Sequence, residues 1–484
     1  MKSYKMYQII IIVVGLLLCF FGRFVPLSPT LSASGTQVLL IMAGGLLMWL
    51  FVGVDWTSMA VILALALVPE LGMNKVAAGS IGNSTVFFLM LCFMLSKSLE
   101  NTGVARRLAV TLLTNEFSRK GAWNTIAMIF LAIFILSSGL SSTVTVMIFL
   151  PIFYEIFKSL DFKQSDGDAF PALMVSSLAI ICQIAQATTP ISHAMTLIGF
   201  AAFNSYTGHP LDFGQYVMVA MPVGILVLVI WFIACKLIWR PDVSRITKLD
   251  YDGLHGDLGP MSKEEKIAAI VYLIVVVFWI APGISKYVCP PIYPLLSKIQ
   301  QCYPPIIALI LLHFIKVDNK SVLSYKDAIK GVPLSTIIFM GAILELGSGF
   351  AMKDIGVGAW LSTVIGSLCS GISPVMFIII MGCASVILTN FMSNAVTCAI
   401  CMAIAMPLVA TIYQGLINPA TIATMITMGI SFAYATPPAT PPVAVVGDSG
   451  WISMGNLFIY GMVAAVISML VMTLIGLPLA NAVF

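Results

Sequence analysis

Residues 135–145 are Ile-Leu-Ser-Ser-Gly-Leu-Ser-Ser-Thr-Val-Thr, a small and polar segment set between helix-forming apolar sequences. A second segment, Ile-Leu-Thr-Asn-Phe-Met-Ser-Asn-Ala-Val-Thr at residues 387–397, repeats this pattern 252 residues later. Within a bilayer, non-helical backbone survives only where protein buries it or where it lines a watery cavity. Two such breaks in corresponding halves of a chain indicate the binding site of a transporter. We expect them to be the tips of two re-entrant hairpins that meet around a solute.

The composition predicts a polytopic membrane protein. The 484 residues are 60% hydrophobic and only 9% charged, and the mean hydropathy is +1.04, whereas about 25% of the residues of a soluble domain are charged. Apolar runs of about 20 residues, the length that crosses a bilayer, recur along the whole chain. The ten cysteines show no paired ligand spacing, so we expect them to be reduced packing residues rather than metal ligands.

The hydropathy pattern predicts an all-α fold with about 11 transmembrane helices and two re-entrant hairpins. The hairpins occupy residues 124–157 and 373–413, and an amphipathic arm precedes each, at 104–118 and 354–368. The spans are expected near residues 8–25, 36–53, 57–69, 82–99, 170–203, 214–239, 267–282, 303–315, 333–349, 419–447 and 456–480. Two of these spans, the ones that follow the hairpins, are interrupted by polar residues and prolines, so we expect broken helices there.

Three pairs of short motifs indicate an internal duplication. Ser84-Thr85 matches Ser335-Thr336 at an offset of 251 residues, and the hairpin tips match at 252. Thr189-Pro190 matches Thr440-Pro441, again at 251. If each half has five spans and one hairpin that does not cross, the two halves have opposite orientations. The fold is then an inverted repeat, with the first helix as an addition.

The distribution of basic residues predicts the orientation. With the N-terminus in the cytoplasm, the inside segments hold 17 lysines and arginines and the outside segments hold five. This bias follows the positive-inside rule. We therefore expect a multi-pass protein of the plasma (inner) membrane with a cytoplasmic N-terminus and an outside C-terminus.

The paired tips, each followed by a Thr-Pro break, resemble the divalent anion:sodium symporter family. The segment Ala435-Thr-Pro-Pro-Ala-Thr-Pro-Pro-Val-Ala-Val-Val-Gly447 is especially similar to the second break of that family. The resemblance extends from about residue 36 to the end of the chain. It implies an elevator-type homodimer in which a transport domain slides along a fixed scaffold and carries di- or tricarboxylates.

The resemblance also implies a division of the chain into scaffold and transport parts. Scaffold helices and the first arm occupy residues 1–122, and the second scaffold part occupies 267–372. The two halves of the transport domain are expected at 123–239 and 373–484, joined through a cytoplasmic connector at 240–266.

Residues of the tips and breaks are the candidate ligands. A hairpin tip or broken helix offers free N–H groups and a positive dipole end to an anion. The predicted substrate-binding residues are Ser141, Ser142, Thr143, Ser393, Asn394, Ala395, Thr189, Pro190, His193, Thr440 and Pro441. Sodium, the only expected accessory ion, is predicted near Ser137, Ser141, Ser142, Thr389, Ser393, Asn394 and Ala439.

Three departures from the family pattern favour exchange of one anion for another over sodium symport. The first tip has Ser142 where the family has Asn, and the second has Ala395 where it has Thr. The first break lacks the glycine-rich run of sodium-coupled members and contains His193 instead. A protonated or donating His193 could supply part of the positive charge that sodium supplies elsewhere. A neutral ring bonded to a nearby group is the alternative.

Other functions remain as alternatives with weaker support. An enzyme is not expected, because the four histidines fall on separate segments and no His-Glu-x-x-His motif occurs. The expected substrates are succinate, malate, 2-oxoglutarate and citrate, and no nucleic acid partner is expected. A sodium-coupled dicarboxylate symporter, or a carrier of sulfate, phosphate or arsenite on the same architecture, is the alternative. Asp448, which closes the second break, is expected to be a cap or a domain contact, with a cation role as the alternative, and Glu345 inside a span has no assigned role.

Overall fold

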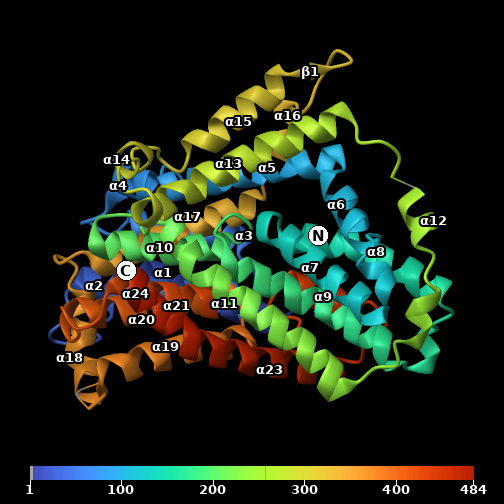
Figure 1. The fold of residues 1–484 in the computed structure, drawn as a ribbon. Coiled ribbons are helices and arrows are strands. Elements are labelled where there is room, and N and C mark those ends of the chain that lie inside the picture. The colour runs from blue at the N-terminus through green and yellow to red at the C-terminus, as the bar shows by residue number, and fades with distance from the viewer. Residues whose placement is uncertain (1–3, 257, 370) are drawn as a thin grey trace.

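The computed structural model describes residues 4–256, 258–369 and 371–484. Across these ranges the chain is helical apart from turns and one short antiparallel ribbon, β1 (Lys316–Val317) with β2 (Lys320–Ser321). Eleven of the described helices are long and apolar enough to cross a membrane. Most of the long helices run across the view in Figure 1, with α12 (Tyr251–Gly256) at one end of the bundle and α18 (Val357–Cys369) at the other.

The order of helices confirms an internal repeat. After α1 (Met6–Phe21), the first half contains α2 (Ala33–Phe51), α3 (Asp55–Ala66), α4 (Gly72–Gly79), α5 (Ser84–Thr102), α6 (Val104–Leu113), α7 (Ala122–Gly139), α8 (Ser142–Ser159), α9 (Ala169–Thr188), α10 (Ala194–Thr207) and α11 (Phe213–Ala234). Following the connector, the second half contains α13 (Lys263–Val288), α14 (Tyr293–Leu296), α15 (Tyr303–Phe314), α16 (Tyr325–Lys330), α17 (Leu334–Ala351), α18, α19 (Pro374–Thr389), α20 (Asn394–Thr411), α21 (Pro419–Gly429), α22 (Pro441–Gly447), α23 (Met454–Val471) and α24 (Leu477–Val483). Apart from α14 and α24, the two series correspond helix by helix.

The eleven long helices are not the same set as the eleven predicted spans. Three of them, α7, α8 and α20, are arms of the two hairpins. By contrast, three predicted spans are not among them: 419–447 is divided into α21 and α22, and 57–69 and 303–315 are α3 and α15, with 12 residues each. Such a helix is about 18 Å long, well short of the ~30 Å hydrocarbon core. The number of spans therefore agrees, while the helices that make it up differ.

The two halves interlock around the centre of the molecule. Both arms of the first hairpin pack against α9, and both arms of the second pack against α21. Each broken helix also crosses into the other half, since α22 packs against α8 and α9 while α10 packs against α20 and α21. The core of the molecule lies here, and α9 is buried along its length from Phe170 to Thr188.

The helices around this centre are also exchanged between the halves. The short helix α3 packs against α17 of the second half, and its counterpart α15 packs against α5 of the first. The arm α6 follows α5 directly, because Gly103 adopts a left-handed conformation (φ 85°) that ends one helix and starts the next. The chain thereby turns sharply from α5 toward the first hairpin.

Candidate substrate-binding site

A cavity of about 520 Å³ lies between the two hairpin tips. Lys97 and Glu100 near the end of α5, which pair at 2.8 Å, and Lys330 at the end of α16 line its outer part. Lys330 also pairs with Asp327 at 2.7 Å. The hydrogen bond from Lys330 lowers the pKa of Asp327 below its ordinary value. We call this outer part the mouth of the cavity.

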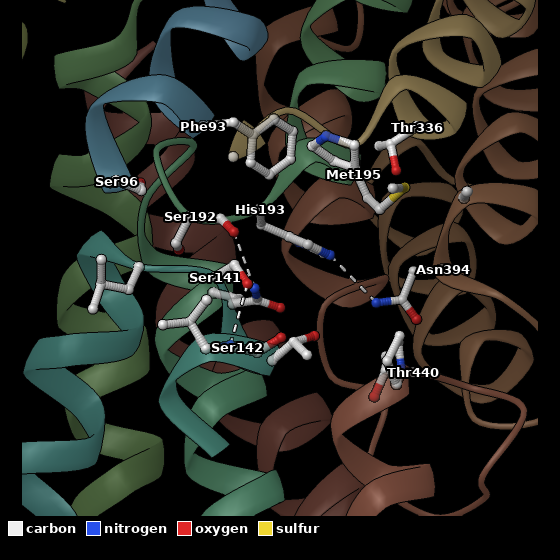
Figure 2. A pocket seen from close by; sticks show the side chains of 18 of the residues that line it. Phe93, Ser96, Ser141, Ser142, Ser192, His193, Met195, Thr336, Asn394 and Thr440 are labelled. Atoms are coloured by element: carbon white, nitrogen blue, oxygen red, sulfur yellow. Dashed lines mark hydrogen bonds between the residues drawn. The ribbon is translucent and has the colours of Figure 1, made fainter. Parts of the chain in front are cut away.

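Both hairpin tips and both breaks meet at the inner end of the cavity. Nine of the eleven predicted substrate-binding residues line it: Ser141, Ser142, Thr143, His193, Ser393, Asn394, Ala395, Thr440 and Pro441. Figure 2 shows the first tip on one side, Asn394 and Thr440 on the other, and the His193 ring between them. Residues far apart in the sequence are thus gathered around one space.

Among the described residues, two predicted ligands and two predicted sodium neighbours do not line the cavity. Thr189 precedes Pro190 behind the first tip, where its hydroxyl donates to the Ser138 carbonyl. Ser137 and Thr389 are fully buried in the hairpin arms. Ala439, also predicted near sodium, does line the cavity.

The structure corrects the predicted equivalence of the two breaks. The Thr189 hydroxyl donates to the Ser138 carbonyl, and the Thr436 hydroxyl donates to the Asn390 carbonyl. Asn390 is the repeat counterpart of Ser138, because the two hairpins are related by an offset of 252 residues. In addition, α10 begins at residue 194 and α22 at residue 441. Equivalent positions of the two breaks are therefore separated by 247 residues in the sequence, and not by 251. Thr189 corresponds to Thr436, and His193 corresponds to Thr440.

His193 joins the two halves across the cavity. Its Nδ1 lies 2.9 Å from the Ser431 hydroxyl and 3.4 Å from the Thr196 hydroxyl, and its Nε2 lies 3.4 Å from the amide nitrogen of Asn394. An Nε2 that accepts from an amide leaves the proton on Nδ1, where it is donated to Ser431. No ion pair of His193 occurs within the described ranges. This arrangement matches the neutral alternative rather than a protonated ring.

Asn390 shapes the second break and was not predicted from the sequence. Its amide nitrogen donates to the carbonyls of Val386 and Phe432, both at 2.8 Å. Its amide oxygen accepts from the backbone N–H groups of Tyr434 (2.8 Å) and Ala435 (2.9 Å). The side chain is 1% exposed. One buried amide therefore ties the second hairpin to the unwound part of the broken helix.

A polar corner in the first half also lines the cavity and was missed. It consists of Gln183 and Gln186 on α9 and Ser192 in the break. The amide nitrogen of Gln183 donates to the Thr440 hydroxyl at 3.0 Å, and that of Gln186 donates to the Ser192 carbonyl at 3.0 Å. The sequence signal was present, since both glutamines interrupt an apolar helix at a spacing of three residues, which places them on one face.

The fold is that of a polytopic membrane protein with paired hairpins, and the names of its family and relatives are those of transporters rather than enzymes. The chain matches the family model described as citrate transporter over residues 37–429. Because the match covers most of its length, this protein belongs to that citrate transporter family.

Individual relatives agree with this assignment. The sodium-dependent dicarboxylate transporter SdcS of Staphylococcus saprophyticus is 24% identical over 494 residues, covering 98% of this chain and 92% of the relative. The protein of the same name from Staphylococcus aureus strain NCTC 8325 is 24% identical over 418 residues, covering 81% and 76%. The crystal structure of the Alcanivorax borkumensis YdaH transporter covers 84% of this chain and 88% of its own, with a TM-score of 0.55 and 12% identity. That structural similarity concerns the fold alone.

Proposed function

We propose that this protein is a secondary active transporter of di- and tricarboxylate anions such as succinate, malate, 2-oxoglutarate and citrate. The observation that carries the proposal is the cavity between the two hairpin tips, whose inner end gathers hydroxyl and amide side chains from both halves among apolar residues. Neutral donors bind carboxylates without a fixed charge, so that the anion can also be released. The names of the relatives, which print dicarboxylates as their substrate, support the same class.

The charges of the site favour sodium coupling over exchange. The ionisable side chains that line the described cavity are Lys97, Glu100 and Lys330 at the mouth, together with His193, whose contacts suit a neutral ring. A dianion in a water-poor site without a counter-charge is costly. Bound sodium ions supply that charge, and the relatives are sodium-dependent by name. Exchange of one anion for another, which the sequence favoured, stays a prediction. Measuring uptake with and without a sodium gradient tests it.

An asymmetry between the halves supports an elevator movement. On one side of the cavity α17 packs against α10 and α20, whereas its counterpart α5 has no comparable packing against α22 and α8 in the described chain. The cavity mouth lies between α5 and the pair α8 and α22, beside Phe93 and Ser96 of α5. If the transport part slides, the two repeats exchange these arrangements, so that α5 closes on α8 and α22 while α17 separates from α10 and α20.

Two exposed apolar side chains mark the surface that would close. Met147 on α8 is 68% exposed and Val445 on α22 is 38% exposed. Both lie one turn beyond cavity-lining residues, on the wall opposite α5. Their repeat counterparts, Ala399 and Ile198, line an apolar crevice against α17. We propose that Met147 and Val445 contact α5 in the second state of the transporter.

The cavity mouth and the basic residues together indicate which side of the membrane this conformation faces. The mouth lies on the side of α6 and the connector, and the distribution of basic residues predicts that this side faces the cytoplasm. This conformation is then the inward-facing one. A homodimer and the division into scaffold and transport domains remain predictions from the family resemblance.

Competition of labelled succinate uptake in proteoliposomes tests the substrate class. We expect unlabelled malate, 2-oxoglutarate or citrate to inhibit uptake, and sulfate, phosphate and arsenite to leave it unchanged. Inhibition by an inorganic anion alone, or no uptake of any carboxylate, would instead favour an inorganic-ion carrier on this architecture.

A further inference from the structure

Gln183 lines the cavity and has a buried amide oxygen without a hydrogen-bond partner. The side chain is fully buried on α9. Its amide nitrogen is occupied by the Thr440 hydroxyl at 3.0 Å. This bond determines the orientation of the amide, with the nitrogen toward Thr440 and the oxygen unpaired.

The pairing gives the two neighbours opposite roles. Since the Thr440 oxygen accepts from Gln183, its own proton is available to a ligand in the cavity, and a carboxylate can accept it. The Gln183 oxygen cannot bind a carboxylate, because both groups are acceptors. An acceptor buried beside an anion site is costly unless the ligand brings a donor to it.

A second unpaired group lies in the same corner. The hydroxyl oxygen of Ser192 is buried, 6% exposed at the residue level, and has no partner. The bond from Gln186 to the Ser192 carbonyl holds the break close to α9. Two buried oxygens without partners therefore occur on one wall of a site that otherwise offers donors.

We propose that the amide oxygen of Gln183 accepts a hydrogen bond from a hydroxyl group of the substrate. The preferred substrates are then 2-hydroxy and 3-hydroxy acids with two or three carboxylates, of which malate and citrate are examples, rather than the unsubstituted succinate. A site built to bind a hydroxyl discriminates strongly against an analogue that lacks it, since its own polar group is left unpaired. The inference rests on the proposed function, because it names the substrate class of the same cavity.

The test compares malate with succinate, which differ by one hydroxyl. Half-saturation concentrations for uptake are measured in proteoliposomes for the wild type, Gln183→Met and Thr440→Val. Methionine has a similar length and no acceptor of comparable strength. We expect Gln183→Met to raise the value for malate about tenfold more than the value for succinate, a typical difference for one hydrogen bond, while the lost bond to Thr440 affects both acids alike. Thr440→Val should raise both values alike, since it removes a carboxylate donor.

Several outcomes would overturn the inference. An equal effect of Gln183→Met on malate and succinate would mean that the amide contacts a carboxylate. A change in the sodium dependence without a change in the malate-to-succinate ratio would mean that the oxygen binds the cation. Gln183→Asn, which withdraws the acceptor by one methylene, guards against a folding defect and should show the same malate-specific loss. Failure of the wild type to transport either acid would instead remove the proposed function itself.

Discussion

Replacement of Met147 by aspartate should trap the transporter in the conformation described above. The side chain is 68% exposed here and lies one turn beyond cavity-lining residues, so we expect a carboxylate at this position to reach the water of the cavity mouth without straining the fold. In the second state the same position is predicted to lie against α5. The substitution therefore destabilises one state of the transport cycle and spares the other.

The size of the effect follows from the exposure of the side chain. Full burial of a methionine contributes about 1.5–3 kcal/mol, so covering the part that is 68% exposed contributes roughly 1–2 kcal/mol to the second state. Burying an unpaired carboxylate at that place costs at least ~2–3 kcal/mol more. The total of about 4 kcal/mol shifts the equilibrium between the states about 1,000-fold. Met147→Ala removes only the first contribution and should shift it about tenfold, and Met147→Leu should be neutral.

Thiol labelling measures the shift without reference to the substrate. A cysteine introduced at Ser96, on the α5 wall of the cavity, is accessible from the mouth in this state and covered in the second. Met147→Asp should raise the labelling rate at this position to its maximum and abolish uptake. Ala399→Asp is the matched control, because Ala399 is the repeat counterpart that already lies at the α17 crevice. It should lower the labelling rate.

The sliding movement predicts that the labelling rate changes in opposite directions in Met147→Asp and Ala399→Asp. Unchanged uptake and labelling in Met147→Asp would show that Met147 never becomes buried. A change in the same direction for Met147→Asp and Ala399→Asp would show that the two surfaces are not exchanged between states. Either result refutes the sliding movement inferred from the repeat.

Three further predictions concern the site and its support. Asn394→Leu removes an amide from the cavity wall together with its bonds to Thr389 and His193, and should reduce succinate and malate uptake at least tenfold in proteoliposomes. Asn390→Leu leaves the buried Phe432 carbonyl and two N–H groups unpaired, which should cost on the order of 3 kcal/mol and lower the melting temperature by several degrees. His193→Gln keeps a polar bridge between the halves and should preserve uptake and its pH dependence, whereas loss of a pH-dependent step would indicate that the ring carries a proton during transport.

The architecture was predictable because its signals are strong in a membrane sequence. Hydroxyls and amides at Ser141–Thr143 and Ser393–Ala395 have no reason to interrupt apolar helices unless they line a cavity, and nine of the eleven expected residues line one. The equivalence of the breaks was mispredicted because the second contains two Thr-Pro pairs, at Thr436 and Thr440. Only the hydrogen bonds to the hairpin carbonyls show which of the two corresponds to Thr189.

Other features depend on contacts that the sequence does not reveal. Asn390 looks like one more polar residue at a hairpin tip, but its four hydrogen bonds reach backbone groups more than 40 residues away in three cases. The Gln183–Thr440 bond spans 257 residues. The neutral surroundings of His193 likewise come from the second half of the chain. The roles of these residues depend on partners far away in the sequence. Neither the residue type nor the local sequence reveals those partners.

Uptake of labelled succinate or malate by purified protein in liposomes shows whether the protein transports dicarboxylates and whether sodium drives that transport. Vesicles are prepared with and without an inward sodium gradient, and with and without unlabelled dicarboxylate inside. We expect uptake into empty vesicles that depends on the sodium gradient, because the described inner wall of the cavity lacks a fixed positive charge. Uptake that requires internal dicarboxylate and is indifferent to sodium would contradict sodium coupling and establish an exchanger.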